Sequence, residues 1–313
     1  MAHHQEHENI FDMIIIGAGV VGYGTAVYAG RFNMKTLIIG DSPGGVITTT
    51  DVVENYPGFK RLTGIELADK LRDHTTDYNV EHVADKVVDV KKLANGMFEA
   101  ATEGKKIYRG RTIVFATGTK WKKLGIPGEE EFANKGVHYC ALCDGAFYRN
   151  KIVCVVGGSD SAAKDALVLT QWASKVYMIY RGEKIRPEPV NYDRVIANKK
   201  IELIYKTNVK EIKGDKFAHT IMLDNPYNGS KEMKMDAVFV AIGHIALSEL
   251  AVKLGVKVDA KGEIIINRDA KTNIDGVYAA GDVADGRFKQ AITGVAEGVQ
   301  AAYSAYEYLE KNK

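Results

Sequence analysis

An apolar run, a turn of closely spaced glycines and a helix-like stretch follow one another in this chain, and the same plan occurs twice. The first copy has an apolar strand over 13–16, the turn Gly17-Ala18-Gly19-Val20-Val21-Gly22, a helix over 23–31 and a second strand over 35–39. In this setting the glycines allow a tight turn, a close approach of backbone to a pyrophosphate and close packing of helix on strand. The helix N-terminus adds partial positive charge, which favours phosphate.

The second copy has an apolar strand over 152–156, the turn Gly157-Gly158-Ser159-Asp160-Ser161-Ala162, a helix over 163–172 and a strand over 175–179. Two copies of one supersecondary plan predict two dinucleotide-binding domains. Strands that follow the second copy return to the first domain, which makes that domain discontinuous. The predicted fold class is therefore α/β, with two Rossmann-like domains that are doubly wound and three-layered.

Apolar spacing and turn residues predict the remaining elements. They are a ligand-wrapping loop over 44–58, helices over 65–78 and 290–309, and strands over 80–90, 98–102, 112–116, 237–243, 263–267 and 276–282. The strand over 35–39 is followed by Gly40 rather than by the acidic residue that commonly binds a ribose at this position. Asp41 comes one residue later, and its side chain either reaches a ribose or caps the turn at 42–45.

Two of the three cysteines, Cys140 and Cys143, are separated by two residues and can close and reopen a small disulfide. Asp144 follows directly. In a reducing compartment such a pair is more often catalytic or metal-binding than a structural cross-link. Cys154 lies inside the predicted strand of the second copy, where we expect a buried and unreactive thiol. The pair therefore predicts a redox-active disulfide, to which the two nucleotide folds bring electrons.

Composition argues against several other classes of protein. The formal net charge of +2 gives no drive toward nucleic acid or an anionic membrane. No apolar run approaches the roughly 18 residues that a membrane helix needs. Residues 1–9 are polar, include His3, His4 and His7, and lack the apolar core of a signal peptide, so we expect a frayed tail rather than a metal site. These features predict a cytoplasmic protein.

Together the motifs resemble those of low-molecular-weight thioredoxin reductases, which are flavoprotein disulfide reductases. The resemblance runs over residues 11–309 and is carried by Gly17-Ala18-Gly19-Val20-Val21-Gly22, Val53-Glu54-Asn55-Tyr56-Pro57-Gly58, Ala116-Thr117-Gly118, Cys140-Ala141-Leu142-Cys143-Asp144-Gly145, Gly281-Asp282-Val283 and Gln290-Ala291. It implies a homodimeric enzyme that passes electrons through FAD and the cysteine pair to a thioredoxin-like protein. It also implies an FAD-binding domain of residues 1–118 and 245–313, and a pyridine-nucleotide-like domain of residues 119–244 that carries the cysteines.

The resemblance also implies roles for single residues. Cys143 receives electrons from the flavin, Cys140 attacks the disulfide of thioredoxin, and Asp144 is the acid–base residue or, alternatively, a turn cap before Gly145. His138 either depresses the pKa of Cys140 or, as we expect, lies at the surface. The implied FAD-binding residues are Gly17, Gly19, Gly22, Asp41, Gly44, Gly45, Asn55, Thr117, Gly118, Gly281, Asp282, Gln290 and Ala291.

The sequence departs from the family's pattern at the second glycine turn, where NADPH would bind. Ser159 replaces a glycine, and the family's His-Arg-Arg-x-x-x-Arg is here Tyr180-Arg181-Gly182-Glu183-Lys184-Ile185-Arg186. The nicotinamide nucleotide would meet Gly157, Gly158, Ser159, Arg181 and Arg186. Loss of one charged phosphate partner costs roughly 1.5–3 kcal/mol, or one to two powers of ten in affinity. We therefore predict that NADPH is a poor electron donor.

The weakened nucleotide motif keeps two other enzymes open. One is a reductase supplied by a donor other than NADPH, and the other is an FAD-dependent dithiol oxidase that passes electrons from a small dithiol to oxygen. A third alternative, a non-catalytic flavin- or zinc-binding redox sensor that uses Cys140 and Cys143, is disfavoured. A tetrahedral zinc site needs four ligands, and only these cysteines and His138 lie close together in the sequence.

Overall fold

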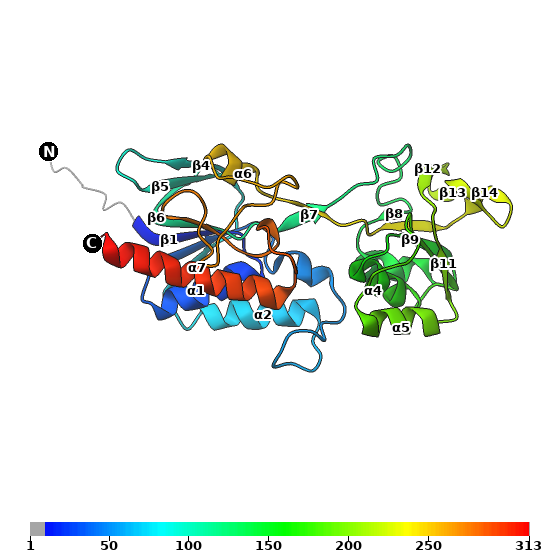
Figure 1. The fold of residues 1–313 in the computed structure, drawn as a ribbon, viewed down its shortest axis with the longest axis horizontal. Helices are drawn as coiled ribbons and strands as arrows, with labels where there is room; N and C mark the ends of the chain where they lie inside the picture. Colours follow the sequence, from blue (N-terminus) through cyan, green and yellow to red (C-terminus); the bar gives the residue numbers. More distant parts are fainter. Residues whose placement is uncertain (1–9, 313) are drawn as a thin grey trace. The chain divides into compact units, whose positions relative to one another are not determined.

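The computed structural model describes residues 10–312, which form two compact units. One unit runs to Lys120 and resumes at Ile245, and the other is Trp121–His244. In Figure 1 the first unit is coloured blue to blue-green and gold to red, and the second green to yellow. The two linking segments, β7 (Thr119–Trp121) and β16 (His244–Ala246), pair with each other. The predicted fold class is confirmed: both units are α/β, and the first is discontinuous.

Residues 1–9, for which a frayed tail is predicted, lie outside the described residues. Over residues 10–312, we find no helix with the length and apolar character that a membrane span requires.

Among the described residues, the first unit has a seven-stranded sheet in the order β3-β2-β1-β6-β5-β4, with β17 beside β6. Its strands are β1 (Ile10–Ile16), β2 (Thr36–Ile39), β3 (Val80–Val83), β4 (Val87–Lys92), β5 (Phe98–Thr102), β6 (Ile107–Phe115) and β17 (Val277–Ala279). Strands β1, β2, β3, β6 and β17 run parallel, whereas β4 and β5 form an antiparallel extension. The parallel part follows from the strand–turn–helix plan, because a helix must return the chain between parallel strands.

The helices of this unit pack on the sheet according to the alternation of side chains along the strands. They are α1 (Val20–Arg31), α2 (Gly64–Thr75), α6 (Glu249–Lys253), α7 (Ala291–Lys311) and the short 3₁₀ helices η1 (Gly45–Thr49) and η3 (Gly281–Val283). Met13 and Ile15 of β1 join the buried cluster with α1 and α7, and Ile14 and Ile16 join the cluster on the opposite face. Figure 1 shows α1, α2 and α7 on one side of the sheet and α6 on the other.

The second unit has a five-stranded parallel sheet in the order β11-β10-β9-β15-β8 and a three-stranded antiparallel sheet in the order β12-β13-β14, counted over the described residues. The strands are β8 (Val137–His138), β9 (Ile152–Val156), β10 (Lys175–Ile179), β11 (Ile201–Ile204), β12 (Val209–Gly214), β13 (Ala218–Tyr227), β14 (Ser230–Lys234) and β15 (Ala237–Val240). The helices are α3 (Ala141–Asp144), η2 (Gly145–Tyr148), α4 (Asp160–Leu169) and α5 (Pro189–Ala197).

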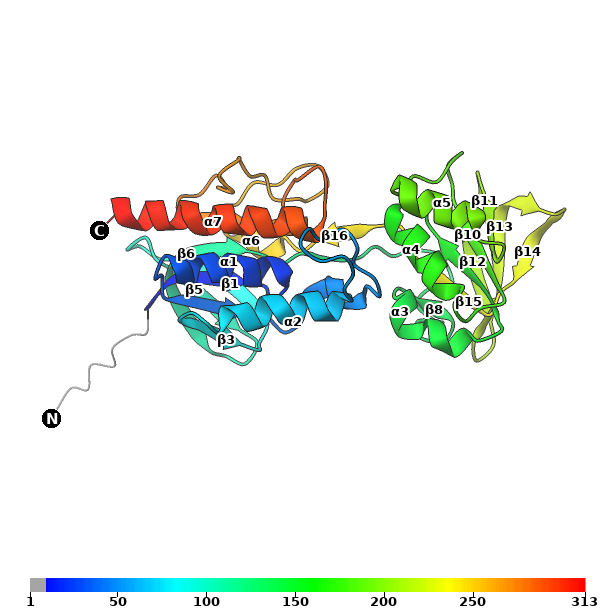
Figure 2. The same ribbon diagram turned by 90° about the horizontal axis from the view of Figure 1, so that it is seen from below.

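Alternation along β9 again divides the core. Val153 and Val155 pack with α4 and α5, whereas Cys154 and Val156 pack toward the antiparallel sheet. Figure 2 shows α4 and α5 set apart from β13 and β14 within this unit. Cys154 is fully buried, as predicted, and burial raises the pKa of its thiol, which disfavours the reactive thiolate.

The strand predicted over 80–90 is in fact two strands, β3 and β4. The Asp85 carboxylate accepts hydrogen bonds from the N–H groups of Lys86, at 2.8 Å, and Gly104, at 3.2 Å. These bonds stabilise a turn between the parallel edge strand and the antiparallel extension. Valines stand on both sides of this turn, at 80, 83, 87, 88 and 90, and this β-rich composition is why the segment reads as one strand.

The strand predicted over 263–267 does not form. Ile264 makes isolated bridges only, to Val258 and Ala284. The N–H group of Ile266 bonds to the side chain of Asp285, at 3.3 Å, rather than to a neighbouring strand. The predicted wrapping loop over 44–58 is irregular as expected, apart from the helix η1.

Candidate active site

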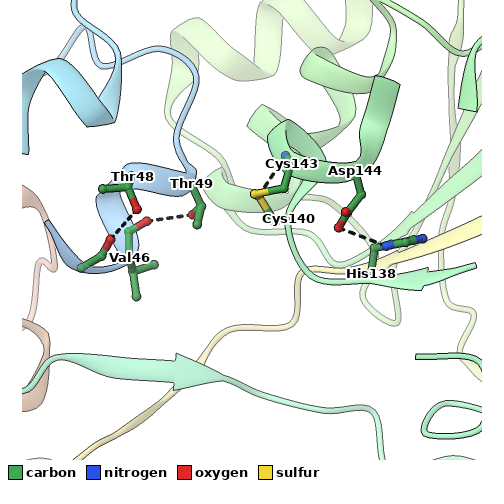
Figure 3. The surroundings of a disulfide bond; sticks show 8 residues. Val46, Thr48, Thr49, His138, Cys140, Cys143 and Asp144 are labelled. Atoms are coloured by element: carbon green, nitrogen blue, oxygen red, sulfur yellow. Dashed lines mark hydrogen bonds and ion pairs between the residues drawn. A yellow bond between two sulfur atoms is a disulfide. The ribbon is translucent and has the colours of Figure 1, made fainter. Parts of the chain in front are cut away.

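The two cysteines of the Cys-x-x-Cys motif lie at the start of α3 and form a disulfide, with their Cα atoms 5.3 Å apart (Figure 3). Cys140 precedes the helix and is half-buried, whereas Cys143 is exposed. The backbone N–H of Cys143 donates to Sγ of Cys140 at 3.1 Å. An N–H donor stabilises negative charge on sulfur. This contact would favour the thiolate form of Cys140 after the disulfide is reduced, and the pair has the geometry of a redox-active disulfide.

Asp144 ends α3, and its Oδ2 atom lies 3.0 Å from Nδ1 of His138 (Figure 3). His138 is only 5% exposed, so the prediction that it lies at the surface is wrong. The residue belongs to β8, which pairs with β15 and places the imidazole against the ring of Phe239. Burial lowers the pKa of His138, and the charge of Asp144 acts in the opposite direction. A strand of two residues is too short to show alternation, so the sequence carried no signal for this burial.

Tyr148 completes this cluster and was not singled out from the sequence. Its hydroxyl lies 2.7 Å from Nε2 of His138, and the two rings are 5.3 Å apart. Burial, followed by the charges of Asp144 and Asp236, raises the pKa of Tyr148 to about 12, so the phenol stays protonated at neutral pH. Tyr148 lies four residues after Asp144, which was the available clue.

In the first unit, the residues that the resemblance assigns to FAD gather at one edge of the sheet. Gly17 comes just after β1, Asp41 after β2, Thr117 after β6 and Gly281 after β17. These strands are parallel, so their carboxyl ends meet at the same edge, which is where ligands bind in open α/β sheets. The fold thus joins four segments that are far apart in the sequence.

The first glycine turn leaves the N-terminus of α1 open. Gly17 has a φ of +121°, and a Cβ atom there would lie 2.2 Å from the carbonyl oxygen of Ala116, so no other residue fits. Gly19 caps α1 without a side-chain hydrogen bond, and the first turn contains no acidic residue. The uncapped N–H groups suit a pyrophosphate, and this observation fits FAD.

Two hydrogen bonds tie the wrapping loop to this edge. The N–H of Gly44 donates to the carbonyl of Ala18 at 2.7 Å, beside the glycine turn. The side-chain amide of Asn55 donates to Oε1 of Gln290 at 2.8 Å. Gln290 caps α7, and so Asn55 and Gln290, which are distant in sequence, stand together at the start of that helix.

The other predicted FAD residues lie along the same edge. The carbonyl of Asp282 accepts a hydrogen bond from Nζ of Lys289 at 2.7 Å, which holds η3 next to the start of α7. Asp41 is exposed and accepts a hydrogen bond from the hydroxyl of Ser42 at 3.3 Å, a contact typical of a turn. Thr117 donates to the carbonyl of Leu247 at 2.7 Å. The remaining members are Gly22 in α1, Gly44 and Gly45 at η1, Gly118 after β6 and Ala291 in α7.

The second glycine turn has a different lining. The ring of Tyr180 lies where a Cβ atom on Gly158 or on Gly182 would fall, at 2.5 Å from either position. The ring therefore packs against the backbone of both glycines. The guanidinium of Arg186 donates a hydrogen bond to the Tyr180 hydroxyl at 3.2 Å. The backbone N–H of Arg186 donates to the carbonyl of Gly158 at 2.7 Å. Ser159 and Arg181 are exposed.

The first turn of α4, unlike that of α1, contains an acidic residue, Asp160. The Asp160 carboxylate contacts Nζ of Lys164 at 2.8 Å and accepts hydrogen bonds from the side chain of Asn191, at 2.8 Å, and the N–H of Glu188, at 3.0 Å. The first turn of α1 has no such residue. The two glycine turns thus share a plan but differ in charge.

Comparison with known proteins agrees with this geometry. A model of the pyridine nucleotide-disulphide oxidoreductase family matches residues 11–298. The chain belongs to this family. Thioredoxin reductase of Bacillus subtilis is 37% identical over 97% of this chain and 96% of the relative. Thioredoxin reductase of Lactococcus lactis superimposes with a TM-score of 0.92, at 36% identity, covering 96% of this chain and 99% of the other. Ferredoxin-flavin thioredoxin reductase of Clostridium acetobutylicum has a TM-score of 0.51 at 31% identity, and the match covers 96% of this chain and 99% of the other.

Membership of the family implies a nicotinamide nucleotide at the second glycine turn, and the residues there do not fit one well. A pyrophosphate needs open backbone at the turn, whereas the Tyr180 ring covers Gly158. The charge that would meet a 2′-phosphate is reduced, because Arg186 bonds to Tyr180 and Gly182 has no side chain.

Proposed function

We propose that this chain is an FAD-dependent thioredoxin-disulfide reductase. One observation carries the proposal: Cys140 and Cys143 form a disulfide at the start of α3, with Asp144 directly beside Cys143, in a member of a disulfide oxidoreductase family. The thioredoxin reductases that resemble it over nearly the whole chain support the choice of a thioredoxin-like partner.

FAD would lie along the carboxyl edge of the first unit's sheet. The uncapped start of α1 would hold the pyrophosphate, Asp282 the ribityl chain, and Gln290 and Ala291 the flavin ring. When bound, FAD supplies the two electrons that reduce the disulfide. The hydrogen bond between Asn55 and Gln290 keeps the wrapping loop against this site.

The chain's own residues then carry out thiol–disulfide exchange. Cys140, whose sulfur accepts the N–H of Cys143, attacks the substrate disulfide, and Cys143 resolves the mixed disulfide. Asp144 gives a proton to the departing sulfur. Phe147 is 78% exposed and lies four residues after Cys143, so it offers an apolar contact for a protein partner.

We also propose a homodimer, as the resemblance implies. An aromatic face on α1 and α7 supports it: Phe32 and Tyr306 stack with centroids 4.9 Å apart, while Tyr28 and Tyr303 are 40% and 44% exposed. A cytoplasmic location stays the expectation drawn from the sequence.

The electron donor is the open part of this proposal. The Tyr180 ring at the second glycine turn favours a donor other than NADPH. The similar Clostridium acetobutylicum enzyme is named a ferredoxin-flavin thioredoxin reductase. We therefore propose a ferredoxin as the alternative electron donor to NADPH.

An anaerobic titration tests the donor. We expect reduced thioredoxin and reduced ferredoxin to bleach the flavin absorbance rapidly, and NADPH and NADH to bleach it slowly or only at high concentration. Rapid bleaching by micromolar NADPH would contradict the prediction that the second glycine turn binds NADPH weakly. Steady oxygen consumption with a small dithiol, and no reaction with thioredoxin, would instead favour a dithiol oxidase.

Replacement of Gly17 by alanine tests the FAD site. The added Cβ atom meets the Ala116 carbonyl at 2.2 Å and forces the turn open, so we expect Gly17→Ala to lose bound flavin and about 2–4 kcal/mol of stability. Gly96→Ala is the matched control, because Gly96 has a φ of +83° and no atom within 4 Å of the added Cβ. It should cost about 1 kcal/mol and keep its flavin. The ratio of flavin to protein absorbance measures bound flavin, and the melting temperature measures stability. A Gly17→Ala protein with a full complement of flavin would contradict the assignment of Gly17 to the FAD site.

A further inference from the structure

We propose that His138 is a positioning residue of the dithiol site, which holds the Asp144 carboxylate in place through a proton on Nδ1. The inference rests on the proposed roles of Cys140 and Asp144 in thiol–disulfide exchange.

The imidazole of His138 is fixed by packing. Its ring stacks on Phe239 with a centroid distance of 5.3 Å and meets the edge of Tyr148 at the same distance, and Tyr148 in turn meets Phe239 at 5.8 Å. Backbone pairing of β8 with β15 places His138 opposite Phe239. A ring held in a close-packed cluster has one orientation, so whatever its nitrogens bind is oriented as well.

The contacts of the ring decide which nitrogen carries the proton. The Tyr148 phenol stays protonated, and burial lowers the pKa of His138, so a neutral imidazole meets a hydroxyl that can donate to Nε2 at 2.7 Å. A neutral imidazole whose Nε2 accepts must carry its proton on Nδ1. The opposite tautomer would turn a lone pair toward the Asp144 carboxylate.

Asp144 is the partner that Nδ1 requires. Nδ1 is buried and has no hydrogen-bond partner within residues 10–312, but Oδ2 of Asp144 lies 3.0 Å away as an ion-pair partner. A buried polar atom needs such a partner. Asp144, the only charged group at contact distance from the ring within the part of the chain that the structure describes, is thereby held at the end of α3 beside Cys143.

The held carboxyl matters when a substrate disulfide is cleaved. In the reduced enzyme the proton of the Cys140 thiol passes to Asp144, which leaves a Cys140 thiolate. Cys140 forms a bond to one substrate sulfur, the substrate S–S bond breaks, and its electron pair leaves on the other sulfur, which takes this proton from Asp144. Cys143 then gives its own thiol proton to the Asp144 carboxylate and attacks the Cys140 sulfur. The mixed disulfide breaks, and the second substrate sulfur leaves with the electron pair and takes that proton. General acids contribute about 10²–10⁴-fold, and misplacement can remove much of this.

A leaving-group comparison on the full-length flavoprotein tests the proposal. The pre-reduced enzyme is mixed rapidly with hydroxyethyl disulfide or with dithiobis-nitrobenzoate, and remaining thiols are counted by alkylation and mass spectrometry. The alkyl thiolate is basic and needs a proton, whereas thionitrobenzoate is weakly basic and leaves without one. We expect His138→Ala to slow the alkyl disulfide by about 10–100-fold and the aromatic disulfide by about twofold or less.

Three further variants separate positioning from packing. His138→Asn keeps an N–H near the Nδ1 position and should recover most of the alkyl-disulfide rate. Tyr148→Phe keeps the aromatic ring but removes the hydroxyl that fixes the tautomer of His138. It should slow the alkyl disulfide less than His138→Ala does, and should likewise spare the aromatic disulfide. Tyr139→Phe is the control, because that hydroxyl donates to Glu129 at 2.8 Å instead and its loss should leave both rates unchanged.

Equal slowing of both disulfides in His138→Ala would show that the residue only supports packing, and no slowing would show that Asp144 needs no partner. A His138→Asn protein as slow as His138→Ala would also overturn the proposal. If the wild-type dithiol reacts with neither disulfide, the proposed function itself fails, and the two failures are thereby distinguished.

Discussion

Cys140→Ser and Cys143→Ser are each expected to lower thioredoxin reduction by about 10³-fold or more, and to fail at different steps. Cys140→Ser removes the thiolate that accepts the N–H of Cys143, so no mixed disulfide forms. Cys143→Ser keeps that thiolate but removes the sulfur that resolves the mixed disulfide. It should therefore accumulate a covalent complex with a single-cysteine thioredoxin activated as its thionitrobenzoate disulfide.

Steady-state turnover and non-reducing mass spectrometry measure both effects. Cys154→Ala is the control, since this thiol is fully buried in β9 and should leave turnover close to wild type. Trapping of thioredoxin by Cys140→Ser rather than by Cys143→Ser would reverse the assigned roles. Substantial turnover in both serine variants would place the chemistry elsewhere.

A Tyr180→His and Gly182→Arg double variant is expected to bind NADPH about 10–100-fold more tightly than the wild type. Histidine lacks the distal ring atoms and hydroxyl that lie beside Gly182, and arginine supplies a charged partner for a 2′-phosphate. In the wild type the guanidinium of Arg186 donates to the Tyr180 hydroxyl at 3.2 Å, so removal of this hydroxyl also frees Arg186 to contact the phosphate. Anaerobic stopped-flow reduction of the flavin at increasing NADPH concentration gives the apparent affinity.

The two substitutions should be strongly coupled. A Cβ atom on residue 182 would meet the Tyr180 ring at 2.5 Å, so Gly182→Arg alone should lower stability without improving binding. Tyr180→His alone should give only a small gain, and addition of Ser159→Gly should extend the gain of the double variant. Additive effects of the single changes would contradict the packing of the Tyr180 ring between Gly158 and Gly182.

The strand–turn–helix plans were predictable because they depend on local rules. The strand over 152–156 and the strand over 175–179 form as predicted, since short apolar runs bounded by turn residues have few alternatives. The break at Asp85 and the irregular segment around Ile264 were not predictable, because hydrogen bonds to distant groups decide them. The contact between Asn55 and Gln290 likewise joins two motifs whose proximity no spacing reveals.

The cysteine pair, its neighbouring Asp144 and the altered residues at the second glycine turn were determined by the sequence alone, because disulfide chemistry and phosphate binding depend on which residue types are adjacent in the chain. Only the tertiary structure decided where the side chains of His138, Tyr148 and Tyr180 lie. A two-residue strand paired with β15 buries His138 against Phe239, and packing against two glycines places the Tyr180 ring over the turn. Contacts of this kind depend on residues that are distant in the chain, and so they arise only when the fold closes.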